Sequence, residues 1–175
     1  KTELEVINTN LDETPPELKQ FDVSEYKFDV SQGDETFILS ANFTDNLSGF
    51  SNSSMSFHWS SPSGQDLIYT HLYQGMDQYI ENNDVFIDVD KNNISFDNIE
   101  VTIPQYSEPG TWTLETVNVS DSANNHTQIR TQELKDLGFK TELEVINTNL
   151  DETPPELKQF DVSEYKFDVS QGDET

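Results

Sequence analysis

The stretch FILSANF at residues 37–43 carries an apolar side chain at every second position. Successive side chains of a β-strand point to opposite faces, so this alternation predicts a strand with one buried face. The same period of two recurs around two tryptophans farther along the chain, and we expect both tryptophans in the core. The alternating apolar residues are Phe37, Leu39, Ala41 and Phe43, then Met55, Phe57 and Trp59, then Trp112 and Leu114.

Turn-forming residues separate this stretch from similar ones on both sides. Glycine and proline at Gly33, Gly49, Gly64 and Pro109-Gly110 fall where the chain is expected to reverse. Many short strands with Greek-key-like spacing and almost no helix predict an all-β sandwich. The predicted strands lie near residues 17–23, 27–31, 35–44, 54–60, 66–73, 85–89, 94–103, 111–120, 125–130 and 141–147.

Two local irregularities are also predicted. After Leu114 the apolar alternation changes phase, which indicates a β-bulge near Glu115–Thr116. The segment Gln132–Leu137 is expected to form one short helical turn that Gly138 ends.

The chain contains a long internal duplication. Residues 1–36 and residues 140–175 are identical, an offset of 139 positions. No fold requires identity at exposed positions, so we infer a tandem array with a period of about one domain. We expect residues 1–11 to be the last strand and linker of a preceding repeat. Residues 12–147 would form one complete domain, and residues 148–175 the linker and first strands of the next.

The composition is strongly acidic and lacks cysteine. The chain has 34 acidic and 9 basic residues, a net charge of −25. This charge argues against nucleic acid and anionic membrane surfaces as partners, and it favours bound cations. Without cysteine, neither disulfides nor thiolate metal sites are available. No run is long and apolar enough to insert into a membrane.

Several of these segments resemble bacterial immunoglobulin-like repeats, which occur in tandem in very large secreted or cell-surface adhesins. The resemblance implies an immunoglobulin-like Greek-key sandwich that acts as an extender, and it implies Ca²⁺ binding, since many such domains bind calcium. The segments that carry it are Asp12–Leu18, Asp29–Asp34, Thr44–Gly49, Ser61–Gly64, Gly110–Leu114 and Val119–Asn125.

One set of acidic residues is expected to meet at a single end of such a sandwich. The start of the first strand and two of the predicted loops lie at the same pole of an immunoglobulin-like domain. Carboxylate and carbonyl oxygens are the ligands that Ca²⁺ prefers. The alternative is that these residues only form turns, as Asp and Asn often do. The candidate ligands are Asp12, Glu13, Asp45, Asp121 and Asn124, with Asp151 as the copy of Asp12 in the next repeat, and Asn46, Ser48 and Asn125 offer further oxygens.

A second, weaker set of candidate ligands lies in an Asp/Asn-rich segment in the middle of the chain. Its members are Asp84, Asp88, Asp90 and Asn92. Their alternate spacing is similar to the start of an EF-hand loop, but Asn93 stands where that motif has glycine, and Ile99 where it has glutamate. A solvated acidic loop is the alternative interpretation.

These observations predict a structural spacer from a long extracellular adhesin or filament, secreted or held at a bacterial cell surface and stiffened by Ca²⁺ between repeats. The expected partners are neighbouring repeats of the same protein, through strand exchange or lateral association. The alternative is an adhesive module that binds carbohydrate or protein, with Tyr69, Tyr73, Tyr79 and Tyr106 as stacking residues. We expect no enzyme, because His58, His71 and His126 form no catalytic spacing and no catalytic motif is present.

Overall fold

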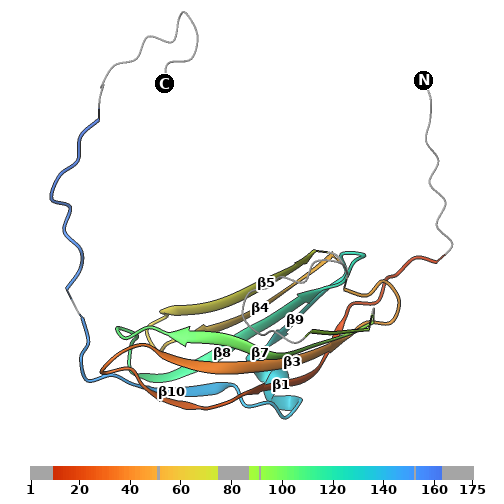
Figure 1. Ribbon diagram of the computed structural model, residues 1–175, viewed down its shortest axis with the longest axis horizontal. Helices are drawn as coiled ribbons and strands as arrows, with labels where there is room; N and C mark the ends of the chain where they lie inside the picture. The colour runs from red at the N-terminus through yellow and green to blue at the C-terminus, as the bar shows by residue number, and fades with distance from the viewer. Residues whose placement is uncertain (1–9, 51, 75–86, 91, 152, 163–175) are drawn as a thin grey trace, which may run out of the picture.

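The computed structural model describes residues 10–50, 52–74, 87–90, 92–151 and 153–162. These residues form two β-sheets and one short helix (Figure 1), which confirms the all-β prediction. The first sheet has the order β1-β3-β7-β6, formed by β1 (Glu17–Val23), β3 (Glu35–Thr44), β7 (Asn93–Ile103) and β6 (Ile87–Asp90). The second has the order β2-β10-β8-β4-β5, with β9 also paired to β8; its strands are β2 (Lys27–Asp29), β10 (Glu142–Ile146), β8 (Gly110–Ser120), β4 (Asn52–Ser60), β5 (Asp66–Gln74) and β9 (His126–Arg130).

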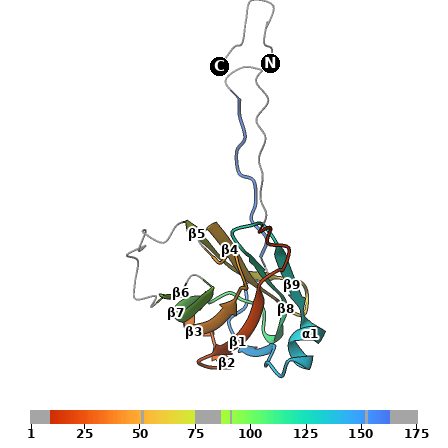
Figure 2. The same ribbon diagram turned by 90° about the vertical axis from the view of Figure 1, so that its right-hand side faces the viewer.

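The two sheets face each other and share one hydrophobic core, seen nearly end-on in Figure 2. Alternate residues of β3 supply its centre, as the FILSANF stretch predicts: Phe37, Leu39, Ala41 and Phe43 are all buried. Trp59 of β4 and Trp112 of β8 are also buried, and the ring of Phe37 meets that of Trp59 edge to face. The alternation of apolar residues therefore predicted the core residues correctly, because the apolar face of each strand is buried away from water.

Strand β8 changes neighbours along its length, and a bulge marks the change. Trp59 pairs with Leu114 while His58 pairs with Thr116, so Glu115 is the extra residue, as predicted. On its other edge, β8 pairs first with β10 and then with β9. The helix α1 (Thr131–Asp136) connects β9 toward β10, and Gly138 follows it with φ 87°. The predicted helical turn is confirmed.

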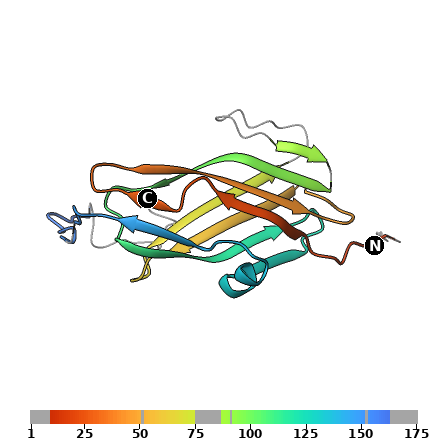
Figure 3. The same ribbon diagram turned by 90° about the horizontal axis from the view of Figure 1, so that it is seen from below.

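The chain enters and leaves the sandwich at opposite ends. Residues 10–16 approach at the right of Figure 1, whereas the segment after Asn147 departs at the left, and Figure 3 shows the same separation from below. We call these the entry end and the exit end. The described strands lie between Glu17 and Ile146. The last strand of a preceding repeat, predicted within residues 1–11, falls mostly on residues 1–9, which lie outside the described residues, so strand exchange stays a prediction.

Two identical segments adopt different structures. Residues 17–23 form β1, whereas their copy at residues 156–162 forms no strand. Phe21 is 6% exposed and its copy Phe160 is 72% exposed. Strand β1 is held by β3, and the sequence contains a single complete copy of β3. The strand therefore depends on its partner in the sheet rather than on local sequence alone.

Candidate metal centre

Three carboxylates converge at the entry end of the sandwich. Asp12 precedes β1, Asp45 follows β3, and Asp121 follows β8. One oxygen from each side chain can be chosen so that all three lie within 4.8 Å of one another. Strands β3 and β8 end at the same pole, which is why residues so distant in sequence meet here.

Asx-type turns hold two of these carboxylates in place. Asp45 Oδ2 accepts hydrogen bonds from the backbone N–H groups of Leu47 (2.9 Å) and Gly49 (2.7 Å). Asp121 Oδ1 accepts in the same way from Ala123 and Asn125, both at 2.8 Å. Short polar side chains that bond to the backbone two and four residues ahead stabilise tight loops. Both aspartates therefore shape the loops that carry them.

Asp12 connects the incoming chain to both loops. Its Oδ2 accepts from the backbone N–H of Ser48 at 2.8 Å, and its Oδ1 from that of Thr14 at 3.1 Å. The amide Nδ2 of Asn125 donates to the carbonyl of Asp12 (3.2 Å) and to Asp121 Oδ2 (2.7 Å). The segment before β1 is thus fixed to the cluster.

The cluster is partly to fully buried, and one of its carboxylate oxygens accepts no hydrogen bond. Asp121 is 0% exposed and Asp12 is 9% exposed. Among the described residues, Asp45 Oδ1 and Ser48 Oγ are buried and have no hydrogen-bond partner. A buried oxygen without a donor costs about 1–3 kcal/mol, and nearby carboxylates also repel one another.

The geometry fits a hard cation. Calcium binds oxygen ligands at about 2.3–2.6 Å, so two ligands of one ion lie up to about 5 Å apart. The three aspartate oxygens satisfy this limit. Asp45 Oδ1 accepts no hydrogen bond in the described structure, so it is available to bind a cation.

Three of the other predicted ligands are exposed, and a fourth reaches the cluster through its amide nitrogen. Glu13 is exposed, and Asp151 is exposed in the linker at the exit end. Asn124 is exposed in a left-handed conformation with φ 65°, which asparagine tolerates better than most residues. Asn125 reaches the cluster, but its amide nitrogen donates there instead of its oxygen acting as a ligand.

Asn92, predicted in the second set of ligands, has a backbone contact with the loop that carries Asp45. It lies at the β6–β7 turn, and its carbonyl accepts a hydrogen bond from the backbone N–H of Asp45 at 2.9 Å. Two other members of the second set lie in a strand. Asp88 and Asp90 belong to strand β6, opposite Ser95 and Asn93 of β7, and Asp84 lies outside the described residues. An extended hairpin cannot wrap around an ion as an EF-hand loop does.

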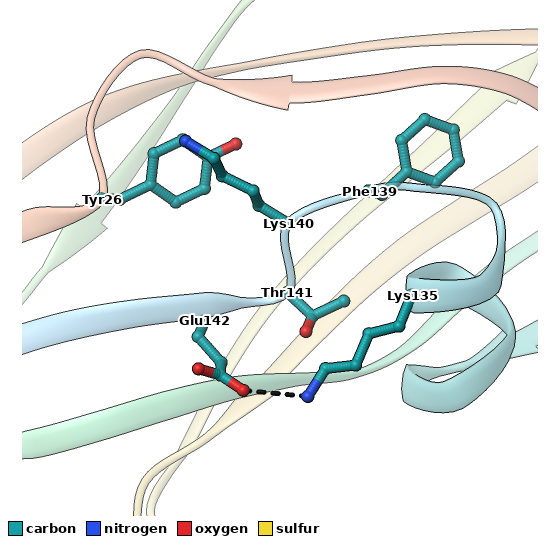
Figure 4. Close-up of a pocket in the computed structure, with 6 residues that line it drawn as sticks. All are labelled: Tyr26, Lys135, Phe139, Lys140, Thr141 and Glu142. Atoms are coloured by element: carbon teal, nitrogen blue, oxygen red, sulfur yellow. Dashed lines mark hydrogen bonds and ion pairs between the residues drawn. The ribbon is translucent and has the colours of Figure 1, made fainter.

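A shallow hollow of about 370 Å³ lies beside the turn between α1 and β10 (Figure 4). Its two lysines are already engaged: Lys135 pairs with Glu142 at 2.9 Å, and the Lys140 ammonium lies 4.4 Å from the centre of the Tyr26 ring. The first pair joins α1 to β10, and the second attaches the turn to the loop before β2. They leave little unpaired charge for a ligand.

The side chain of one predicted stacking residue is described. Tyr106 lies in the loop between β7 and β8 at the exit end and is 56% exposed. Tyr79 lies outside the described residues. The described helix has neither the length nor the apolar character needed to cross a bilayer.

Comparisons with known proteins add no family assignment. No protein-family model matches the sequence, and no curated protein matches it.

Proposed function

We propose that this chain is a spacer module of a long extracellular adhesin or filament, stiffened by Ca²⁺ where successive repeats join. The proposal includes an immunoglobulin-like sandwich repeated with a period of about 139 residues. It also places the protein outside the cell, secreted or at a bacterial surface. The spacer role needs no catalytic residue and no deep pocket.

The order of the strands supports the immunoglobulin-like part. In that fold, strands A, B, E and D form one sheet, and strands G, F and C lie in the other. Taking β1, β3, β7 and β6 as A, B, E and D reproduces the first sheet. Strands β10, β8 and β4 then take the places of G, F and C, and the short β2 pairs in parallel with β10.

The position of the two ends supports the spacer part. A domain whose chain enters at one end and leaves at the other extends an array with every added copy (Figure 1). A ten-residue strand such as β3 is roughly 33 Å long, so each copy would add about 40 Å.

The convergence of Asp12, Asp45 and Asp121 carries the calcium part. The three segments that carry the cluster, residues 10–16, 45–50 and 121–125, contain neither lysine nor arginine. The exit-end loops, residues 29–34, 61–64 and 104–110, contain none either. These segments therefore supply no positive side chain of their own to the cluster. Lys91 of the adjacent β6–β7 turn lies outside the described residues, and a bound cation is the counter-charge that we propose.

The cluster residues would stiffen the junction through their own connections. Asp12 belongs to the segment that follows the linker, whereas Asp45 and Asp121 belong to loops of the sandwich. A Ca²⁺ ion would supply positive charge to all three carboxylates. Asp12 and the linker before it would then be fixed against the domain.

Calcium titration of the 175-residue chain tests the proposal. Isothermal calorimetry should detect a site in the wild type that Asp45→Asn removes, since the substitution neutralises the carboxylate whose Oδ1 has no donor. Asp97→Asn is the matched control, because it removes an exposed carboxylate from β7 and should leave binding intact. Equal calcium binding by all three proteins would refute the site. Small-angle scattering of a multi-repeat chain should show greater extension in calcium than in chelator, and equal extension would refute the stiffening.

A further inference from the structure

Where the linker leaves the exit end, Asn147 holds it against the domain. The side chain of Asn147 is nearly buried, and its Nδ2 donates to the carbonyls of Gln105 (2.7 Å) and Ser107 (3.0 Å). Its Oδ1 accepts from the backbone N–H of Asn149 at 2.9 Å. The backbone N–H of Thr148 donates to Ser31 Oγ, also at 2.9 Å. The linker is therefore ordered at its start.

The far end of the linker already has the local structure of the next entry end. Asp151 Oδ1 accepts from the backbone N–H of Thr153 at 2.9 Å. Its counterpart in the complete domain, Asp12, accepts from Thr14 at 3.1 Å in the same turn. The four Cα–Cα steps from residue 147 to residue 151 span at most about 14 Å. Two domains joined in this way must bring their ends close together.

A single leucine of the linker is observed twice, in two different surroundings. Leu150 follows a complete domain and is 42% exposed, whereas its identical copy Leu11 precedes one and is 65% exposed. The same side chain is thus less exposed after a complete domain than before one. A second domain packed against the linker would reduce the exposure of Leu150 further.

We propose that successive copies pack directly end to end around this linker leucine. The inference rests on the tandem arrangement in the proposed function and adds a contact surface to it. The occupant of the exit end is the next copy, because residues 151–175 repeat residues 12–36. Tyr106 lies between the two carbonyls that Asn147 binds and is 56% exposed, so it supplies further apolar surface beside the linker.

The test uses a chain extended by one period, so that residues 148–175 continue into a second complete domain. In that chain, Leu150 lies between two domains and Leu11 has a domain on one side. Leu150→Ser should increase the rate of proteolytic cleavage in the linker by about tenfold, since burial of a leucine is lost. It should also broaden the distance distribution measured by small-angle scattering. Leu11→Ser is the matched control, with the same local sequence, and should change the cleavage rate at residues 148–150 and the scattering very little.

Equal effects of the two substitutions, or no effect of Leu150→Ser, would overturn the end-to-end contact. Both substitutions should leave the melting temperature of the 175-residue chain unchanged, which separates a junction effect from misfolding. Measurements at saturating calcium separate this inference from the metal site. If Leu150→Ser leaves linker cleavage and scattering unchanged while calcium still binds, only the end-to-end contact is refuted. If Leu150→Ser changes them but calcium does not bind, only the metal site is refuted.

Discussion

Replacing Asp45 by asparagine should have opposite effects on stability with and without calcium. In chelator, the wild-type cluster holds three carboxylates whose oxygens approach within 4.8 Å. Two unit charges about 4–5 Å apart repel by roughly 3–4 kcal/mol at an effective dielectric constant near 20. The backbone donors of the turns and the solvent reduce this repulsion, so we expect relief of about 1–2 kcal/mol when one charge is removed.

The geometry of the turn favours the substitution in the absence of metal. The amide oxygen of the substituted side chain would keep the hydrogen bonds from Leu47 and Gly49 that Asp45 Oδ2 now accepts. The NH₂ group of that side chain would take the place of Asp45 Oδ1, which has no donor, and would add no negative charge to the cluster with Asp12 and Asp121. The melting temperature in chelator should therefore rise by about 3–8 °C.

Calcium should reverse the order of stability of the wild type and the variant. A ligand present at 100 times its dissociation constant stabilises the folded protein by about 2.7 kcal/mol. The wild type should gain this amount and the variant little of it, because the variant lacks a charged ligand. Thermal unfolding followed by circular dichroism, in chelator and in calcium, measures both effects, and Asp97→Asn corrects for the loss of one negative charge. A variant that is less stable than the wild type in chelator would refute the reasoning, because the cluster would then need its third charge without metal.

Two further predictions concern the core and the pH dependence. Phe57→Ala should lower the free energy of unfolding by about 3–5 kcal/mol in urea titrations, because the Phe57 ring is fully buried with ring centres of Phe21 and Trp59 at 5.7 and 6.2 Å; a loss below about 1 kcal/mol would contradict this packing. Burial and the hydrogen bond to Asp22 raise the pKa of Tyr26 from 10.0 to about 12, so its contribution to stability is fully present below pH 10 and is lost as the pH rises through about 12. Chemical denaturation should show that Tyr26→Phe loses less stability than the wild type between pH 10 and about pH 12. Parallel plots of unfolding free energy against pH for the two proteins would contradict the raised pKa of Tyr26.

Much of the fold follows from the sequence because its strands each have one buried face. The bounds of β1 and β3 were predicted to the residue, and the bulge at Glu115 follows from the change of phase after Leu114. Local hydrogen bonding is likewise encoded locally, since Asp12 and Asp151 make the same turn in different surroundings. Strand pairing is not encoded locally, because the copy of β1 at residues 156–162 forms no strand.

The metal cluster could be predicted in part from the order of the strands. Asp12, Asp45 and Asp121 meet because of the order of the strands, which the resemblance to immunoglobulin-like repeats implied. The place of Asn92 beside Asp45 depends on how the β6–β7 turn packs against the end of β3, which no local pattern indicates. Asn124 was assigned by proximity in sequence, but its backbone conformation serves the turn.

A crystal structure of the chain grown in calcium, with the ion located by its anomalous scattering, tests the central claim most directly. We expect one Ca²⁺ bound to oxygens of Asp12, Asp45 and Asp121 at about 2.3–2.6 Å. A structure from calcium-rich solution in which the three carboxylates point apart, or surround no cation, would contradict it.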